Sequence, residues 1–490
     1  MVIASVLAAG VMILLLTPSL RTQRDRTAGP LVVYCGAGLR GPVEAIARQY
    51  EEKYGVPVQL QYGPSQTLLA NLAVTSRGDL FIPAEEDYIH LGRQRGLIAE
   101  AIPLARVKAV LAFRKDAARQ PGSLEELIRM QARLAFPEPE AAAAGRVARD
   151  ALRVAGQWDS VARLVAVYKP TVSDVVNDIK LGSVDAGFIW DALARQHPEL
   201  AFREVLPSEK AAARVMVGVL RASQQPAAAL RFARFLAARD RGLEVFRTHH
   251  FVVEEGDAWA DPPEIVFYSG AMNRVAIEET VRRFEQREGV RVTMVYNGCG
   301  ILVGQMKAGG RPDAYLTCDA SFLPPVADLF APQVREVSQS DIIILVPKGN
   351  PRGIQTLSDL ARPGLRVGLA NPEQSTLGAL TRRLLESQAI LAPVMSNVVA
   401  QTPTADMLVN QMRAGGLDAT VVYISNTMKV RDHLDVIPLH MPGSTAVQTY
   451  SVARQTRYPH LVGRLAAAIL SAESRQRYLD AGFVWRGTNR

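Results

Sequence analysis

Cysteine and aromatic residues are scarce in this sequence of 490 residues. Three cysteines occur, Cys35, Cys299 and Cys318, and no two of them stand in Cys-x-x-Cys spacing. An odd number without that spacing excludes a disulfide framework and a zinc knuckle, although a single bridge between Cys299 and Cys318 stays open. Aromatic residues make up 6% of the chain, and no dense basic run is interleaved with them, so nucleic acid is not indicated as a partner.

Motifs that carry catalysis or hold a metal are also missing. Nothing in the sequence resembles a catalytic triad or a P-loop, and no group of Cys and His has the spacing of metal ligands. The seven histidines include one adjacent pair, His249 and His250, whose side chains point apart on most backbones. We therefore expect neither enzymatic activity nor a resident cofactor or metal ion.

One apolar stretch suggests a membrane. Residues 2–16 carry no charge, but a membrane-spanning helix needs about 20 apolar residues. The stretch suits the apolar region of a secretory signal, and the lack of a cysteine near its end argues against a lipoprotein anchor. Basic residues follow it rather than precede it, which by the positive-inside rule favours a cytoplasmic C-terminal side. We predict that residues 1–26 form a signal peptide or a membrane anchor, and we favour export to a periplasmic or extracytoplasmic location.

The charge balance is mildly basic. Lys and Arg together number 56 against 48 Asp and Glu, a net charge of +8, and the basic residues are scattered along the chain. Such an excess either attracts anions or an acidic membrane surface, or belongs to an arginine-rich solvated surface. The length is sufficient for several cores, since domains hold roughly 100–200 residues.

The sequence repeats itself once over nearly its full length. The stretch 34–37 (Tyr-Cys-Gly-Ala) matches 268–271 (Tyr-Ser-Gly-Ala), 234 residues later. After one deletion the separation is 233 residues, and the matched pairs include Pro139 with Pro372, Pro170 with Pro403, Asn177 with Asn410 and Asp185 with Asp418. A period above 200 residues is too long for a solenoid unit and indicates a duplicated domain. We place module 1 at residues 31–255 and module 2 at 264–490, with a turn-forming linker between them.

Each half begins with the same succession of strand and helix patterns. Short apolar runs at 31–33 and 265–267 are typical of buried strands, and a turn that contains glycine follows each of them. Apolar residues then recur at intervals of three, four and seven, as on one face of a helix, until Gly55 and Gly289 end the pattern. Strand–helix–strand units predict an α/β fold with mainly parallel sheets.

The turn after the first strand is a candidate ligand site in each half. In open parallel sheets, ligands bind beyond the carboxyl ends of strands, near helix N-termini. The small residues at 35–38 and 269–271 let backbone N–H groups approach a ligand, and Ser269 adds a hydroxyl donor. The same residues are also typical of a tight turn that needs glycine.

The turn after the second strand recurs at the matching place, at 63–67 and 297–300. Each copy leads into a helical pattern. Ser65 and Asn297 are good helix N-caps, and they are equally placed to form an oxyanion cradle.

A late loop and strand form the third candidate in each half. Loop 170–177 precedes Trp190 in module 1, and loop 403–410 precedes Tyr423 in module 2. Tyr423 ends an apolar run, so its hydroxyl is able to reach a cleft, whereas Trp190 has no hydroxyl. Either aromatic residue also fits a core or an interface.

Together these segments resemble the molybdate/tungstate-binding proteins of ABC transporters, within the type II periplasmic binding-protein superfamily. The motifs are the strand–turn–helix opening, Asn-Gly-Cys-Gly at 297–300, Asp-Ala-Tyr-Leu at 313–316, Asn-Pro-Glu at 371–373 before Gly378, and Leu-Asp-Ala at 417–419 before Tyr423. The resemblance covers each half almost end to end. It implies that each module consists of two α/β lobes, joined by crossover strands, that close on a tetrahedral dianion.

The resemblance also implies which groups hold the ligand, namely uncharged hydroxyls and backbone N–H donors. In module 2 the matching positions are Ser269, Gly270, Ala271, Gly298, Cys299, Gly300, Leu377, Thr404 and Tyr423. In module 1 they are Gly36, Ala37, Ser65, Gln66, Ala144, Val172 and Trp190. The family usually has a Ser-rich second turn, and Trp190 replaces a Tyr. We therefore expect module 1 to be the weaker binder.

Three functions follow from these observations. The leading hypothesis is an exported solute-binding protein that captures a molybdate-like oxyanion for an ABC permease, without catalysis. The second is a metal-cation binder, in which Cys299, Cys318 and Asp319 lie in loops that converge on the cleft of module 2, because soft thiolates favour Cu(I) or zinc. The third is a membrane-anchored ligand sensor that uses the same fold without transport.

Overall fold

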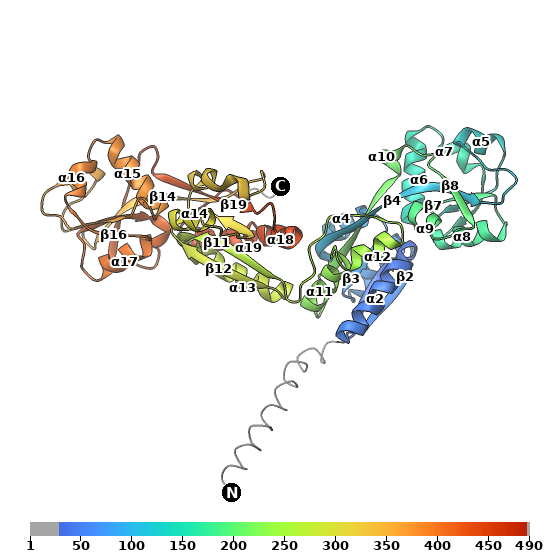
Figure 1. The fold of residues 1–490 in the computed structure, drawn as a ribbon, viewed down its shortest axis with the longest axis horizontal. Helices are drawn as coiled ribbons and strands as arrows, with labels where there is room; N and C mark the ends of the chain where they lie inside the picture. Colours follow the sequence, from blue (N-terminus) through green and yellow to red (C-terminus); the bar gives the residue numbers. More distant parts are fainter. Residues whose placement is uncertain (1–28, 488–490) are drawn as a thin grey trace, which may run out of the picture. The chain divides into compact units, whose positions relative to one another are not determined.

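The computed structural model describes residues 29–487 and divides the chain into two compact units, Met1–Trp259 and Ala260–Arg490. In Figure 1 the first unit runs from blue to green and the second from yellow to red. The predicted signal or anchor segment at residues 1–26 lies outside the described residues. Among the helices of the described part, none is long and apolar enough to cross a membrane.

Module 1 is an α/β structure. Its strands are β1 (Leu31–Gly36), β2 (Val58–Gly63), β3 (Leu80–Ile82), β4 (Ile98–Arg114), β5 (Leu134–Pro137), β6 (Val165–Lys169), β7 (Ala186–Trp190), β8 (Leu200–Arg203), β9 (Ala212–Leu220) and β10 (Val252–Val253). Its helices are η1 (Ala37–Leu39), α2 (Arg40–Tyr54), α3 (Ser65–Thr75), α4 (Asp87–Gln94), α5 (Leu124–Arg129), α6 (Ala143–Val154), α7 (Trp158–Ala162), α8 (Val172–Leu181), α9 (Asp191–Arg195), α10 (Ser208–Ala211), α11 (Pro226–Leu236) and α12 (Gly242–Thr248).

Module 2 repeats this succession. Its strands are β11 (Glu264–Gly270), β12 (Arg291–Asn297), β13 (Ala314–Leu316), β14 (Arg335–Pro347), β15 (Val367–Ala370), β16 (Val398–Thr402), β17 (Ala419–Tyr423), β18 (Leu434–Pro438), β19 (Thr445–Val452) and β20 (Val484–Trp485). Its helices are η2 (Ala271–Asn273), α13 (Arg274–Glu288), α14 (Cys299–Lys307), η3 (Ala320–Phe322), η4 (Pro324–Leu329), η5 (Leu357–Ala361), α15 (Thr376–Ser387), α16 (Leu391–Met395), α17 (Ala405–Arg413), η6 (Ile424–Asn426), α18 (Pro459–Ile469) and α19 (Ala472–Asp480).

The two modules share one sheet order, which confirms the predicted α/β fold and its tandem duplication. The order is β2-β1-β3-β9-β4-β7-β5-β6 in module 1 and β12-β11-β13-β19-β14-β17-β15-β16 in module 2. Helices α2 and α13 end at Gly55 and Gly289, which adopt left-handed φ values of +67° and +64°. Glycine accommodates that conformation without a Cβ clash, so both helices end where the sequence predicted.

A long strand joins two lobes in each module. Strand β4 pairs with β9 over its first part and with β7 from Ala109 to Phe113, and β14 passes in the same way from β19 to β17. The first lobe thus contains β1, β2, β3 and β9 or their copies, and the second lobe contains β5, β6 and β7 or theirs. Strands β1 to β3 and β5 to β7 pair in parallel, whereas β4 and β9 run antiparallel to their neighbours, which the sequence pattern did not reveal.

Aspartates that recur in both modules accept hydrogen bonds from backbone N–H groups at the starts of strands. Asp79 accepts a hydrogen bond from the N–H of Val32 at 2.9 Å, and its copy Asp313 accepts one from Val266 at 2.9 Å. In the second lobes, Asp185 and Asp418 accept in the same way from the backbone N–H groups that precede β5 and β15. These residues recur because they satisfy backbone donors at strand starts.

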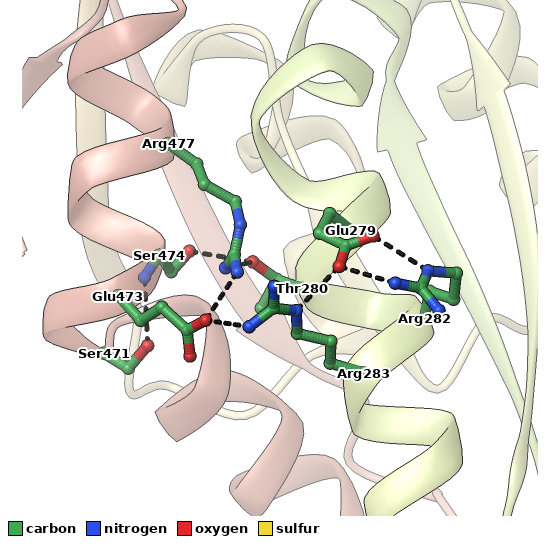
Figure 2. A network of polar contacts seen from close by, with 8 residues as sticks. All are labelled: Glu279, Thr280, Arg282, Arg283, Ser471, Glu473, Ser474 and Arg477. Atoms are coloured by element: carbon green, nitrogen blue, oxygen red, sulfur yellow. Dashed lines mark hydrogen bonds and ion pairs between the residues drawn. The ribbon is translucent and has the colours of Figure 1, made fainter.

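Polar contacts hold helix α19 against α13 in module 2 (Figure 2). Arg477 donates to the hydroxyl of Thr280 at 2.9 Å and to Glu473 at 2.8 Å, and Arg283 of α13 pairs with the same Glu473. The buried hydroxyls of Thr280 and Ser474 lie 3.3 Å apart. The C-terminal helices therefore belong to the first lobe of module 2.

A buried ion pair on the same helix gives a first prediction. Glu288 of α13 accepts two hydrogen bonds from Arg464 of α18, at 2.7 and 3.0 Å, and its side chain is 3% exposed. We expect Glu288→Ala to destabilise module 2 by about 3–5 kcal/mol, because it leaves a part-buried guanidinium without its carboxylate. Chemical unfolding of the full chain measures the loss.

Glu278→Ala on the same helix is the matched control. The pair of Glu278 with Arg274 has side chains that are 60% and 59% exposed, so its loss costs less than about 1 kcal/mol. Equal losses for the two variants would contradict the importance of the buried pair.

Candidate functional site

In each module the two lobes meet at the carboxyl ends of the parallel strands, and we call this junction the cleft of the module. In module 1 the cleft is lined by Gly36, Ala37, Gly38, Gly63, Pro64, Ser65, Ala84, Ala142, Ala143, Ala144, Pro170, Thr171, Val172 and Trp190. The first lobe supplies the turns after β1, β2 and β3, and the second lobe supplies the N-terminal turns of α6 and α8. The cavity between them measures about 20 Å³, the room that one water molecule needs.

Trp190 occupies much of the module 1 cleft. It ends β7, and its side chain is 1% exposed. A Cβ added to Gly38 would lie 3.0 Å from Cδ1 of the indole and 2.9 Å from the side chain of Val172, so the indole packs directly against the first turn. The ring therefore takes the space beside the backbone N–H groups that a ligand would need.

Contacts across the cleft hold module 1 closed. The N–H of Gln66 in the first lobe donates to the carbonyl of Ala141 in the second at 3.1 Å. Arg146 of α6 pairs across the cleft with Glu85 and, at 2.9 Å, with Asp87. Its guanidinium also lies 5.1 Å from the centre of the Tyr88 ring. Because Glu85 is 6% exposed, this pair is largely shielded from water.

Module 2 has no counterpart of this ion pair. The positions that match Glu85, Asp87 and Arg146 carry Asp319, Ser321 and Ala379. Asp319 instead caps η3, where it accepts from the N–H of Ser321 at 3.0 Å. The two clefts therefore differ in what keeps their lobes together.

Two glycines bring the lobes of module 2 into backbone contact. A Cβ added to Gly298 would collide with the carbonyl oxygens of Gln374 and Pro403, and one added to Gly300 would collide with that of Glu373. Gly298 and Gly300 belong to the first lobe, and the three carbonyls belong to the second. The predicted second turn therefore lies at the interface of the lobes.

The interpretation of Ser65 and Asn297 as helix N-caps is wrong. Pro64 and Gly298 occupy the N-cap positions of α3 and α14, and neither helix has a side-chain cap. The hydroxyl of Ser65 accepts from the N–H of Ala84 at 3.2 Å, and Asn297 accepts from the N–H of Gly298 at 2.9 Å. Both side chains thus order the cleft loops.

The first turn of module 2 uses its hydroxyl locally. Ser269 is fully buried and donates to the carbonyl of Gly270 at 3.3 Å, as the thiol of Cys35 does to Gly36 at 3.5 Å in module 1. Ala271 follows as the first residue of η2. This turn therefore offers a ligand backbone groups rather than the Ser269 hydroxyl.

Two further predicted residues lie at helix N-termini of the second lobe. Leu377 is buried in the first turn of α15, and Thr404 is the N-cap residue of α17. The Thr404 side chain makes no cap hydrogen bond. At such positions the backbone N–H groups are the ones that face an anion.

Two thiols lie side by side in the module 2 cleft. The N–H of Cys318 donates to the sulfur of Cys299 at 3.1 Å, and both cysteines are free and buried. Burial opposes ionisation of Cys299, but hydrogen bonds from Cys318, Thr376 and Tyr315 outweigh it and lower the pKa of this thiol. The bond to Cys299 and burial raise the pKa of Cys318 well above its ordinary value. The two thiols therefore titrate as a pair, in which the loss of one proton opposes the loss of the second.

Three buried hydroxyls surround the thiols. Tyr315 lies in β13 and is fully buried. Thr376 is the first residue of α15, and Tyr423 is the last residue of β17. Within the described part of the chain, none of their oxygens has a hydrogen-bond partner of normal geometry. Burial raises the pKa of Tyr423 well above its ordinary value, and the two neighbouring thiols add to the effect. The phenol therefore remains a donor at neutral pH.

The sequence did not identify Tyr315 and Thr376 as site residues. Tyr315 lies in the stretch 313–316, which contributed only to the family resemblance, and Thr376 immediately precedes Leu377, which was singled out for its backbone. A usable signal was the position of Thr376 in the first turn of a helix that follows a parallel strand.

The cation site predicted from Cys299, Cys318 and Asp319 lacks a complete ligand set. Both carboxylate oxygens of Asp319 accept backbone hydrogen bonds, from Ser321 and from Val447. Across residues 29–487, no group of three or more Cys, His, Asp or Glu is arranged to hold a metal ion. The two sulfurs thus stand among hydroxyls rather than among further anionic ligands.

Comparisons with known proteins give one family for both modules. The family described as bacterial extracellular solute-binding protein matches residues 31–252 and again 265–484. A putative binding protein of Haemophilus influenzae is 28% identical over 238 residues, which are 48% of this chain and 96% of that protein. The molybdate-binding protein ModA of Mycobacterium tuberculosis is 26% identical over 224 residues, 45% of this chain and 84% of that protein.

A solved structure has also been matched. The periplasmic molybdate-binding protein of Azotobacter vinelandii is 17% identical, with a TM-score of 0.42, and the match covers 46% of this chain and 100% of that one.

Proposed function

The chain belongs to the bacterial extracellular solute-binding protein family, and from that premise we propose that it captures a tetrahedral oxyanion of the molybdate or tungstate type for an ABC importer. Binding is reversible and involves no catalysis, cofactor or metal. The protein acts outside the cytoplasm, where it delivers the ligand to a permease. A relative whose name states that it binds molybdate supports this ligand class.

The observation that carries the proposal is the set of uncharged donors in the cleft of module 2. The hydroxyl of Tyr423 is buried without a hydrogen-bond partner within the described residues, and those of Tyr315 and Thr376 approach the sulfur of Cys299 without a hydrogen bond of normal geometry. Buried polar groups normally have a hydrogen-bond partner, so these three point to an acceptor that binds among them. An oxyanion presents acceptors in several directions at once.

Helix N-termini add to the donor set. Helices α14, α15 and α17 begin at the cleft of module 2, and their first N–H groups have no partner within the helix. Together with the helix dipoles, they favour a negative charge without any basic side chain. A site of this kind selects an anion by the number and direction of its hydrogen bonds.

Module 2 is the working site in this proposal, and module 1 is not. In module 1 the indole of Trp190 and the ion pair of Arg146 leave room for about one water molecule. Tyr423 stands where module 1 has Trp190, and Ala379 where it has Arg146. One ligand per chain is therefore expected.

Thermal unfolding of the full chain with molybdate, tungstate, sulfate and phosphate tests the proposal. A ligand at 100 times its Kd adds about 2.7 kcal/mol of stability, so molybdate or tungstate is expected to raise the Tm of module 2 by several degrees. Tyr423→Phe removes one donor and is expected to weaken binding about tenfold. Calorimetric titration should give one site per chain.

Two results would contradict the proposal. The absence of any rise in Tm with all four anions would remove the oxyanion function. Two equivalent sites per chain would show that module 1 also binds.

A further inference from the structure

We propose that the cleft of module 2 binds the trivalent oxyacid of a thiophilic element, such as arsenous acid, by joining its central atom to the sulfurs of Cys299 and Cys318. The inference deepens the proposed function and rests on it for the role of the cleft in solute capture. It names a second class of ligand for the same site, one that uses groups a tetrahedral dianion leaves unengaged.

The two sulfurs are within reach of one atom. The N–H of Cys318 lies 3.1 Å from the sulfur of Cys299. A Cβ added to Gly270 would collide with the sulfur of Cys318 and would lie 3.2 Å from that of Cys299, so both sulfurs pack against the same glycine. Cys299 also stands first in α14, where the helix dipole favours a thiolate. The first lobe thus presents a paired soft donor.

The groups around the sulfurs are hydroxyl donors, which need oxygen acceptors on the outside of the ligand. Thr376 and Tyr423 belong to the second lobe and Tyr315 to the first, and the hydroxyl of Thr376 lies close to both sulfurs. All three hydroxyl oxygens are buried and have no partner of normal geometry within residues 29–487. They suit an acceptor on the ligand. The cleft therefore combines a soft centre with hard donors around it.

A bare cation does not fit this combination. A soft cation held by two thiolates needs further anionic or neutral ligands, and hydroxyl donors would stay unpaired beside it. The carboxylate of Asp319, the residue next to Cys318, accepts hydrogen bonds from the backbone N–H groups of Ser321 and Val447. A trivalent oxyacid supplies both parts, because it keeps a hydroxyl on the atom that the sulfurs bind.

The binding step balances without an oxidant or reductant. Two arsenic–sulfur bonds form and two arsenic–oxygen bonds break. Each leaving hydroxide takes the proton of one thiol, so two water molecules are released and arsenic remains trivalent. The remaining As–OH accepts hydrogen bonds from Thr376 and Tyr423, which draws the second lobe onto the first.

Module 1 provides an internal comparison. Ser65 and Ala84 stand where module 2 has Cys299 and Cys318, so module 1 has no thiol pair. Its one cysteine, Cys35, is buried and donates to the carbonyl of Gly36. A single thiol cannot chelate the oxyacid, so Cys35 serves as a matched control in the same chain.

Native mass spectrometry of the reduced full chain with sodium arsenite tests the inference. One arsenic atom per chain is expected, with the ultraviolet absorption of arsenic–sulfur bonds. Cys299→Ser and Cys318→Ser should each weaken binding more than a hundredfold, and Cys35→Ser should leave it unchanged. Tyr423→Phe should retain the arsenic with several-fold weaker affinity. Thermal unfolding of each variant without ligand establishes that it folds, and Cys318→Ala replaces Cys318→Ser if that variant does not.

The inference is overturned if arsenic binding survives Cys299→Ser and Cys318→Ser, or if it depends on Cys35. A tungstate titration on the same protein separates the two proposals. Tungstate binding without arsenite binding overturns the inference and keeps the proposed oxyanion function. Arsenite binding without binding of any tetrahedral oxyanion overturns the proposed oxyanion function and keeps the inference.

Discussion

Gly298→Ala is expected to weaken ligand binding to module 2 more than a hundredfold. The added Cβ would collide with the carbonyl oxygens of Gln374 and Pro403, which belong to the opposite lobe. The backbone of Gly298 has φ −61° and ψ 137°, which any residue adopts, so the loss does not come from local strain. It comes from the lobes, which can no longer reach the closed arrangement in which donors from both surround one ligand. A hundredfold loss corresponds to about 2.7 kcal/mol.

Calorimetric titration with the best-bound ligand measures this effect, and Gly304→Ala is its control. Gly304 lies in the same helix, α14, and a Cβ added to it would meet nothing within 4 Å. That substitution should leave affinity unchanged and stabilise the helix by up to about 1 kcal/mol. Unaltered binding by Gly298→Ala would mean that the ligand is held without this closure.

The sequence predicted the fold because each signal lies within a short segment and occurs in both halves of the chain. The glycines that end α2 and α13, the apolar runs of β1 and β11 and the order of both recur after 234 residues. Agreement between the copies separated these signals from chance. The sequence did not predict that β4 and β9 run antiparallel, because strand direction depends on pairing between segments more than 100 residues apart.

The candidate site was predictable only in part, for the same reason. Tyr423 and the turn at Gly298 and Gly300 are recognisable in a single stretch of sequence. The groups around Cys299 are not recognisable in this way, because Thr376 belongs to the other lobe and comes close to Cys299 only in the folded protein. Arg146 and Glu85 are 61 residues apart, and neither segment of sequence distinguishes its charge from one on a solvated surface.

The N-cap interpretation of Ser65 failed because two local roles compete for one hydroxyl. A serine before a helix usually accepts from the N–H of the next turn. Here Ser65 is already inside α3, and the donor that it meets is the N–H of Ala84, in the loop that follows β3. The loop after β3 therefore determines the role of this side chain more than the helix does.

The two modules differ in what joins their lobes, and in our proposal they have different tasks. In module 2 the lobes meet through glycines, and no ion pair like that of Arg146 and Glu85 joins them among the described residues, so we propose that a ligand supplies this link. In module 1 an ion pair supplies the contact that a ligand would otherwise provide, and Trp190 fills its place. A module closed by its own side chains is able to stabilise the chain but not to respond to a solute.

Arg146→Ala is accordingly expected to destabilise module 1 by about 3–5 kcal/mol and to open its cleft. The substitution leaves the carboxylate of Glu85, which is 6% exposed, without its counter-ion. Opening the lobes hydrates that carboxylate at the expense of the packing around Trp190. We expect a red shift of tryptophan fluorescence and stronger quenching by acrylamide, together with a lower midpoint of chemical unfolding for module 1.

Arg149→Ala separates this effect from the loss of an arginine as such. Arg149 lies on the same helix, α6, and pairs with Glu140 and Asp150 of its own lobe, whose side chains are 82% and 51% exposed. Its removal leaves only exposed carboxylates behind, so it should cost less stability than Arg146→Ala and leave the fluorescence unchanged. Glu85→Gln added to Arg146→Ala should restore much of the stability, because a neutral amide can remain buried where a lone carboxylate cannot. An Arg146→Ala variant with native fluorescence would show that the packing of Trp190 and the hydrogen bond from Gln66 to Ala141 hold the cleft of module 1 closed without the ion pair.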